Sequence, residues 1–384
     1  MPTAPRPPTL IGSVWRRWAV SLGLLAGLLT GCHDDGKGGG ASSTTRPGGA
    51  SSTTAPTAPA AASPGFLGAS YASDQEGWAL SKEPCPRPGA DHAQCGVVSK
   101  TSDGGDTWAR LTRLDVPTDD SGGTDFVSAI HVADATHAWV YDRSLYATFN
   151  SGKRWQAVAL GNPVVALGSL GSQAYALVGC AAGAGNCGAP TRLAEGTIAT
   201  GRWRFASLGF DLPSTIGGAV VSSRSAVYAL VGDPGRDQVL LARTGNHWER
   251  RTVPCPRAIV AAIEAQDGLV AACPPPGANG PTELQTSSDG GRTWAVVWQQ
   301  SFVSPPVALA VAGDAAVVSL ESGEVLRSVD NGMHFSTVLK TDGRPGIHFV
   351  DAQHGFITTR SPAGGRLFST RDGGATWRAA KVPG

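Results

Sequence analysis

Residues 101–108 read Thr-Ser-Asp-Gly-Gly-Asp-Thr-Trp, residues 287–294 read Ser-Ser-Asp-Gly-Gly-Arg-Thr-Trp, and residues 370–377 read Thr-Arg-Asp-Gly-Gly-Ala-Thr-Trp. Weaker copies of this octet end at four further aromatic residues: Trp155, Trp203, Trp248 and Phe335. The seven aromatic ends are 41 to 48 residues apart. Such a period is typical of β-propeller blades. Seven copies therefore predict seven blades.

Each period contains four short segments rich in strand-forming residues, with turn residues between them. In the last period these segments are 346–350, 355–358, 366–369 and 376–379. No apolar pattern with a 3.6-residue spacing continues over three helical turns, so the sequence favours strands over helices. We expect an all-β, seven-bladed β-propeller of four-stranded antiparallel blades, with the octet between the third and fourth strands.

The two ends of the repeat region bear on how the ring closes. The first period begins with its own first strand near Phe66, and the last period completes its fourth strand by Lys381. We therefore expect the ring to close without exchange of a strand between its ends.

Composition excludes one class of function. The 384 residues include 31 Lys and Arg against 30 Asp and Glu, which gives a net charge of +1. Nucleic-acid binding normally needs an excess of positive charge, because it depends on neutralising phosphates. We therefore expect no nucleic-acid partner.

The first 31 residues are typical of an export signal. Arg6, Arg16 and Arg17 precede the apolar segment 19–29, which is too short to span a bilayer as a helix. The following Leu-Thr-Gly-Cys32 resembles the lipobox of bacterial lipoproteins, and this resemblance implies cleavage after residue 31 and lipidation of Cys32. The doublet Arg16–Arg17 leaves twin-arginine export open as an alternative to the general secretory route.

Residues 32–64 are predicted to be a tether. Residues 33–64 contain no Val, Ile, Leu, Met, Phe, Trp or Tyr, and such a segment cannot bury enough apolar surface to fold. A flexible chain of this length reaches roughly 30 Å. The sequence thus predicts a signal peptide (1–31), a lipidated tether (32–64) and a propeller (65–384). It also predicts a lipid-anchored location outside the cytoplasm, at the bacterial cell membrane.

The octet resembles the Asp-box, or bacterial neuraminidase repeat, and the chain resembles Asp-box propellers of the sialidase-like superfamily over about 320 residues. The Asp is expected to accept backbone N–H bonds from its turn, while the Trp packs into the sheet of its own blade. The resemblance implies a structural role, not a metal or sugar site, for the residues of the three full boxes: Asp103, Gly105, Trp108, Asp289, Gly291, Trp294, Asp372, Gly374 and Trp377. In blade form, including Gly77–Trp78 and Gly355–Phe356, the chain is also similar to the photosystem II assembly and stability factor family.

Six cysteines remain once Cys32 is assigned to the lipid. In an oxidising compartment they are expected to form disulfides, and fifteen pairings are possible. The blade assignment favours the sequential pairs Cys85–Cys95, Cys180–Cys187 and Cys255–Cys273, because it places all six at strand ends on one side of the ring. We call this side, which carries the loops between second and third strands, the disulfide face. It lies opposite the octets.

Loops of the disulfide face supply the candidate binding residues, since long loops on a rigid scaffold are the usual place for binding. The candidates are His92, Asp119, Asp120 and Arg236. The acidic loop 118–125 lacks the ligand spacing and closing Glu of an EF-hand, and no C-x-x-C pair occurs. We therefore predict neither a metal site nor a cofactor.

Two classes of function remain. A sialidase would need an arginine triad and a nucleophilic tyrosine with a Glu partner; the Phe-Arg-Ile-Pro signature of sialidases is absent, and seven blades are expected instead of six. The chain contains five tyrosines: Tyr71, Tyr141, Tyr146, Tyr175 and Tyr228. Xyloglucan-type glycosidases use two propellers, but carboxylates such as Glu264 and Glu321 leave a hydrolase open. The sequence favours a monomeric, non-catalytic module that binds a protein or glycan outside the cytoplasm, with a glycoside hydrolase as the alternative.

Overall fold

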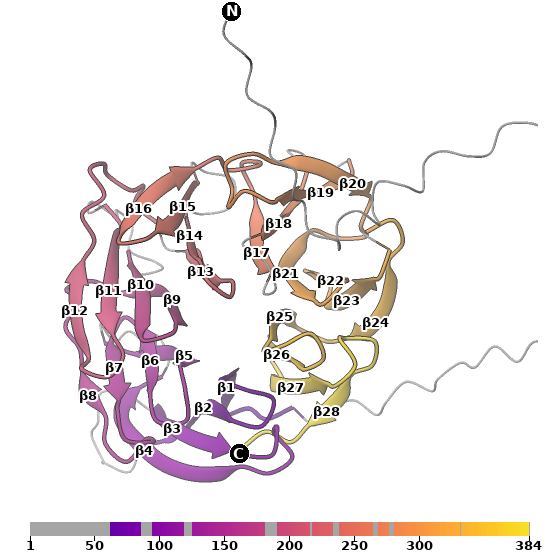
Figure 1. The fold of residues 1–384 in the computed structure, drawn as a ribbon. Helices are drawn as coiled ribbons and strands as arrows, with labels where there is room; N and C mark the ends of the chain where they lie inside the picture. The colour runs from indigo at the N-terminus through magenta and orange to yellow at the C-terminus, as the bar shows by residue number, and fades with distance from the viewer. Residues whose placement is uncertain are drawn as a thin grey trace, which may run out of the picture. The chain divides into compact units, whose positions relative to one another are not determined.

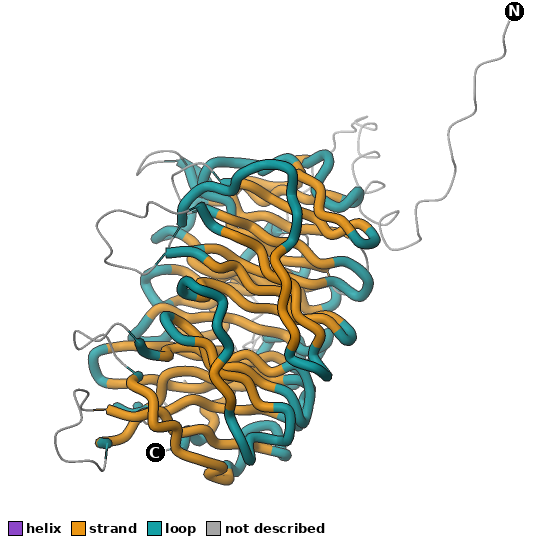
Figure 2. Tube along the Cα trace, turned by 90° about the vertical axis from the view of Figure 1, so that its left-hand side faces the viewer, coloured by secondary structure: helices purple, strands orange, loops and turns teal. Residues whose placement is uncertain are grey.

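Seven four-stranded antiparallel sheets follow one another around a ring, each built from consecutive strands (Figure 1). The computed structural model describes residues 62–85, 94–118, 125–180, 190–215, 217–232, 238–263, 268–275, 280–330 and 332–383. These residues form 28 strands and contain no helix (Figure 2). The fold is therefore the predicted all-β, seven-bladed propeller.

The strands are numbered along the chain, four to a blade. Blade 1 contains β1 (Phe66–Tyr71), β2 (Gly77–Pro84), β3 (Gln94–Thr101) and β4 (Ala109–Pro117), and blade 2 contains β5 (Val127–Val132), β6 (Ala138–Asp142), β7 (Leu145–Thr148) and β8 (Gln156–Ala157). Blade 3 contains β9 (Val164–Leu170), β10 (Gln173–Val178), β11 (Arg192–Thr197) and β12 (Arg202–Phe205), and blade 4 contains β13 (Gly218–Ser222), β14 (Val227–Val231), β15 (Val239–Thr244) and β16 (His247–Arg251). Blade 5 contains β17 (Ile259–Ile263), β18 (Gly268–Cys273), β19 (Thr282–Ser287) and β20 (Ala295–Gln300). Blade 6 contains β21 (Pro306–Ala312), β22 (Ala315–Leu320), β23 (Glu324–Ser328) and β24 (Ser336–Lys340), and blade 7 contains β25 (Arg344–Phe349), β26 (Gly355–Ser361), β27 (Gly364–Thr370) and β28 (Arg378–Ala380).

The fourth strands begin later than the sequence predicts. The predicted segment 376–379 includes Thr376 and Trp377, but β28 starts at Arg378. The N–H of Thr376 donates to Oδ1 of Asp372 over 2.9 Å, so it is held in the turn and does not join the strand ladder. In blades 1 and 5 the fourth strand likewise starts only after the octet tryptophan, with β4 starting at Ala109 and β20 at Ala295.

The hydrophobic core lies mainly between neighbouring blades. Trp78 and Leu80 of β2, both fully buried, pack with Val127, Val132 and Val140 of blade 2. Each sheet thus buries its faces against the sheets on either side, which explains why the middle strands read as continuous apolar runs. The first strand of every blade lies at the centre of the ring (Figure 1).

Blades 1 and 7 meet without sharing a strand among those described, as expected. Ser63 and Gly365 exchange two backbone hydrogen bonds of 3.0 Å, and the ring of Tyr71 stacks on that of Phe356. Arg360 of β26 donates to the carbonyl oxygens of Leu67 in blade 1 and Ser128 in blade 2. Side-chain contacts therefore hold blades 1 and 7 together in addition to the two backbone hydrogen bonds.

Candidate functional site

Two of the three predicted disulfides are present. Cys85 and Cys95 join the end of β2 to β3, with their Cα atoms 5.1 Å apart. Cys255 and Cys273 join the segment before β17 to the end of β18, with a Cα separation of 5.8 Å. Cys180 is also disulfide-bonded, while Cys187 lies outside the described residues. These bonds anchor loops of the disulfide face to the middle strands of blades 1 and 5.

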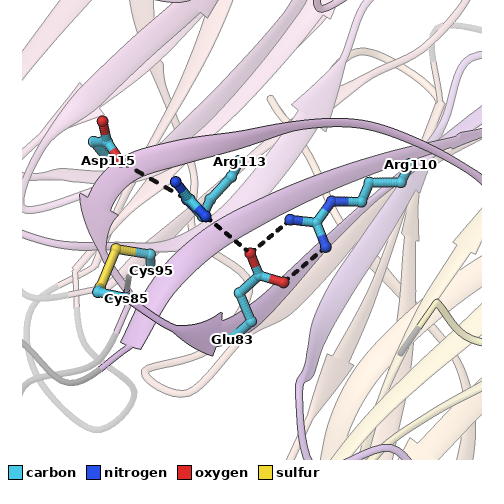
Figure 3. The surroundings of a disulfide bond; sticks show 6 residues. All are labelled: Glu83, Cys85, Cys95, Arg110, Arg113 and Asp115. Atoms are coloured by element: carbon cyan, nitrogen blue, oxygen red, sulfur yellow. Dashed lines mark hydrogen bonds and ion pairs between the residues drawn. A yellow bond between two sulfur atoms is a disulfide. The ribbon is translucent and has the colours of Figure 1, made fainter. Parts of the chain in front are cut away.

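Charged side chains of β2 and β4 lie beside the Cys85–Cys95 bond (Figure 3). Glu83 accepts hydrogen bonds of 2.7 and 2.6 Å from the two terminal nitrogens of Arg110. Arg113 lies 3.8 Å from Glu83 on one side and 3.8 Å from Asp115 on the other. We call these four residues the charged corner.

The charged corner is a surface feature. The hydrogen bonds from Arg110 lower the pKa of Glu83, so the carboxylate is ionised at neutral pH. The Arg110 side chain remains 52% exposed, and exposed ion pairs add little stability because water screens them. Fixed surface charges of this kind contribute instead to steering and orienting a charged partner.

The four candidate binding residues are not placed by the structure: His92, Asp119, Asp120 and Arg236 lie outside the described residues. The same holds for Cys32 and Glu264. Glu321 is described, and its carboxylate is 54% exposed at 3.9 Å from Arg344. Over the described part of the chain, no three His, Cys, Asp or Glu side chains gather as they would around a metal ion. The same residues include no helix long and apolar enough to span a membrane.

The octet turns have the predicted internal hydrogen bonds. Oδ1 of Asp103 accepts from the N–H of Thr107 over 2.9 Å and from the hydroxyl of Thr101 over 2.7 Å. Gly105 has φ of 93°, the left-handed region in which a side chain would be strained. The Asp289 and Asp372 turns repeat these hydrogen bonds. Burial opposes ionisation of Asp289, but the hydrogen bonds from Thr293 and Ser287 outweigh it and lower its pKa to about 2.

The octet tryptophans pack against their own blades, as expected: Trp108 lies edge-on to Tyr71 of blade 1 and Trp377 edge-on to Phe349 of blade 7. The expectation was incomplete, because they also contact the preceding blade. The indole N–H of Trp108 donates over 2.8 Å to the carbonyl oxygen of Lys381, after blade 7. That of Trp294 donates over 2.8 Å to Thr252, after blade 4, and Trp377 packs with Val317 of blade 6. A large indole at the outer rim needs a second sheet to cover it, and the preceding blade supplies that sheet.

Blades 3 and 4, whose octets have lost the Asp, contain a buried carboxylate that the sequence analysis missed. Glu195 on β11 is 5% exposed. It lies 2.7 Å from Arg204 of the same blade and 3.1 Å from Arg243 of blade 4, and it accepts a 2.9 Å hydrogen bond from the indole of Trp248. We call these four residues the Glu195 cluster. A signal existed in the sequence: Glu195 lies two residues after Leu193, so both side chains point to the same buried face of the strand.

A cavity of about 850 Å³ runs along the first strands at the centre of the ring. At one level of the strand register, four consecutive blades place polar side chains in it and the other three place apolar ones. The polar residues are His348, Ser70, His131 and Ser169, and the apolar residues are Val221, Ala262 and Val311.

The histidines of this central channel are neutral at physiological pH. Partial desolvation by the surrounding walls lowers the pKa of His131 and of His348, and the Nε2 atom of His131 lies 2.9 Å from the Ser169 hydroxyl. His348 nevertheless keeps surface exposed to the channel. The described residues that line it include Arg224 and no carboxylate, so they offer neutral hydrogen-bonding groups and one guanidinium.

No protein-family model and no curated protein sequence matches the chain. Solved structures do match its fold. The chain is similar to YCF48 bound to D1 peptide, with 15% identity, a TM-score of 0.50, and coverage of 83% of this chain and 93% of that one. It is also similar to YCF48 from Cyanidioschyzon merolae, with 14% identity, a TM-score of 0.53, and coverage of 82% and 98%. A third similar structure is the β-propeller domain of the Trilobed protease from Pyrococcus furiosus, with 7% identity, a TM-score of 0.55, and coverage of 83% and 97%. At sequence identities this low, the structural similarity shows a shared β-propeller fold and nothing more.

Proposed function

We propose that the protein is an exported Asp-box lipoprotein whose propeller is a non-catalytic module that binds a macromolecule outside the cytoplasm. The observation that carries the proposal is the charged corner beside the Cys85–Cys95 disulfide (Figure 3). A disulfide limits the motion of the loop that it closes, so less freedom is lost when a partner binds. Binding surfaces fixed in this way are common on rigid scaffolds.

A protein ligand is favoured over a glycan by one comparison. A YCF48 structure with the same fold is bound to a peptide. The charged corner offers two arginines and two carboxylates within one exposed patch, a mixture suited to a polar protein surface. A glycan ligand and a glycoside hydrolase are the alternatives.

The membrane anchor is tested first. Replacing Cys32 with Ser should move the protein from the membrane fraction to the soluble fraction, because the lipid is attached through that thiol. Substitution of Cys85 with Ser in the same assay serves as the control, since it removes a thiol without removing the proposed anchor. Retention of the Cys32→Ser variant in the membrane would contradict the lipoprotein assignment.

The binding surface is tested by cross-linking the protein in intact cells, identifying its partner and measuring the affinity with purified components. Arg110→Gln combined with Arg113→Gln should weaken binding, as should Asp119→Ala combined with Asp120→Ala. Asp289→Ala on the opposite side should lower stability without a specific effect on affinity. Unchanged affinity in both disulfide-face variants would refute this location. Steady hydrolysis of a sialoside or β-glucan, abolished by a single carboxylate substitution on the disulfide face, would make the protein an enzyme.

A further inference from the structure

A groove of about 550 Å³ lies between blades 3 and 4, on the face opposite the disulfides. Its lining comes from strand ends and turns on that side of the two blades: Gln173, Glu195, Thr197, Arg202, Trp203, Arg204, Arg243 and Asn246. Three of these residues carry a positive charge and one carries a negative charge. The groove therefore has a net charge of about +2 at neutral pH.

The Glu195 cluster holds two of the three arginines in place. Oε2 of Glu195 accepts hydrogen bonds from Nε and Nη2 of Arg204, and its Oε1 accepts one from Nε of Arg243. The guanidinium of Arg243 also lies 5.5 Å from the ring centre of Tyr175. A guanidinium has five N–H groups, so both arginines keep donors beyond those that Glu195 uses.

Arg202 supplies the third guanidinium and is exposed. Within the described part of the chain it takes part in no ion pair, so no carboxylate there neutralises it. The neutral lining residues add further donors, namely the side-chain amides of Gln173 and Asn246 and the hydroxyl of Thr197. This arrangement offers many donors and an uncompensated positive charge in one place.

The stretch of sequence that contains blades 3 and 4 has more arginines than carboxylates. Residues 158–257, which include blades 3 and 4, contain nine arginines, no lysine and five carboxylates, although the whole chain has a net charge of only +1. Positive charge is thus concentrated in this part of a nearly neutral protein. Such a field raises the local concentration of anions and their rate of binding.

We propose that the groove between blades 3 and 4 binds a phosphate dianion, either as the free ion or as a phosphate monoester. Two negative charges match the net charge of the groove, whereas a single carboxylate would neutralise only half of it. Phosphate oxygens also accept the paired N–H bonds that a guanidinium presents. The site is separate from the charged corner, so it stands or falls independently of the proposed function.

The test is a calorimetric titration of the full chain with inorganic phosphate, glycerol phosphate, acetate and chloride at pH 7.5 and constant ionic strength. We expect saturable binding of one phosphate, with acetate and chloride at least tenfold weaker. Arg202→Gln should weaken phosphate binding by about tenfold, the usual effect of losing one hydrogen bond from a charged group. Arg250→Gln is the matched control: it removes the same charge from an exposed position over Phe210, outside the groove lining, and should change the affinity less than twofold.

Asn246→Asp is the second variant, and it keeps the proposal testable if Arg202→Gln is unstable. It places a negative charge at an exposed turn of the groove and should also weaken binding by about tenfold. At pH 5 binding should weaken, because a phosphate monoester loses one of its charges below pH 6. Comparable affinity for glycerol phosphate and inorganic phosphate would show that the site also accepts esterified phosphate, and binding of inorganic phosphate alone would assign it to the free ion. Phosphate affinity equal to that of chloride, or full affinity in both groove variants, would overturn the proposal.

Discussion

Removing the charge of Glu195 is the most direct way to test how blades 3 and 4 are joined. In Glu195→Gln one carboxylate oxygen becomes an amide NH₂ group. If that group takes the position of Oε2, its N–H donors face Arg204, which itself only donates. If it takes the position of Oε1, it faces Arg243 and Trp248 instead. Because glutamine is neutral, both guanidiniums lose their counter-ion in either arrangement, and one of them also faces an N–H donor.

The magnitude follows from the burial of the two arginines. Arg243 is 19% exposed, so the destabilisation caused by leaving it unpaired approaches the 3–5 kcal/mol typical of a broken buried pair. Arg204 is 73% exposed, and its contribution is near that of a surface pair, below about 1 kcal/mol. Because the cluster lies close to the rim, where solvent screens it, we expect Glu195→Gln to lower the free energy of unfolding by about 2–3 kcal/mol.

Urea unfolding followed by tryptophan fluorescence measures this loss, since Trp248 belongs to the cluster. Glu321→Gln is the control: this carboxylate is 54% exposed and its partner Arg344 is 68% exposed, so its loss should matter much less. Burial alone would raise the pKa of Glu195, yet the hydrogen bonds from Trp248, Arg243 and Arg204 lower it. The difference in the free energy of unfolding between wild type and variant should therefore reach its full size above pH 4.5, near the unfolded-state pKa of Glu195. It should vanish as the pH falls through the lower pKa that Glu195 has in the native state. A loss no larger than that of Glu321→Gln would refute the reasoning.

Three further changes test other parts of the ring. Asp289→Ala should lower the free energy of unfolding by about 1 kcal/mol, an effect present above pH 4 and lost towards the native pKa of about 2; thermal unfolding at several pH values measures it, and a pH-independent loss would contradict it. Arg360→Gln should weaken the contact between blades 1 and 7 by about 1–2 kcal/mol, and hydrogen exchange should then speed up in β1 and β26 before blade 4. Reduction of Cys85–Cys95 and Cys255–Cys273, which close loops of 10 and 18 residues, should each cost about 3 kcal/mol in the loop-entropy model, and equal unfolding curves with and without reductant would exclude this.

The blades and two disulfides could be predicted because their determinants are local or periodic. The Asp103 turn makes its hydrogen bonds within seven residues, so the octet alone specifies it. Cys85 and Cys95 flank one loop, and assigning the strands was enough to pair them. Interactions between residues close together in the chain can be recognised in the sequence as motifs and spacings.

Interactions between blades could not be predicted in the same way. Trp108 bonds to Lys381, 273 residues away, and Arg243 reaches Glu195 across 48 residues. Neither contact has a motif, because each depends on how neighbouring sheets are oriented. The polar half of the channel is hidden for the same reason: Ser70, His131 and His348 become neighbours only when the ring closes.

The closing contact between Ser63 and Gly365 has a mechanical consequence. The chain enters blade 1 at this pair, directly beside the last blade, so tension applied from the N-terminal side acts first on two backbone hydrogen bonds. No covalent bond and no shared strand among those described reinforces this junction. In a single-molecule pulling experiment the ring should therefore open at the seam between blades 1 and 7 at low force, and the remaining blades should unfold afterwards in larger steps.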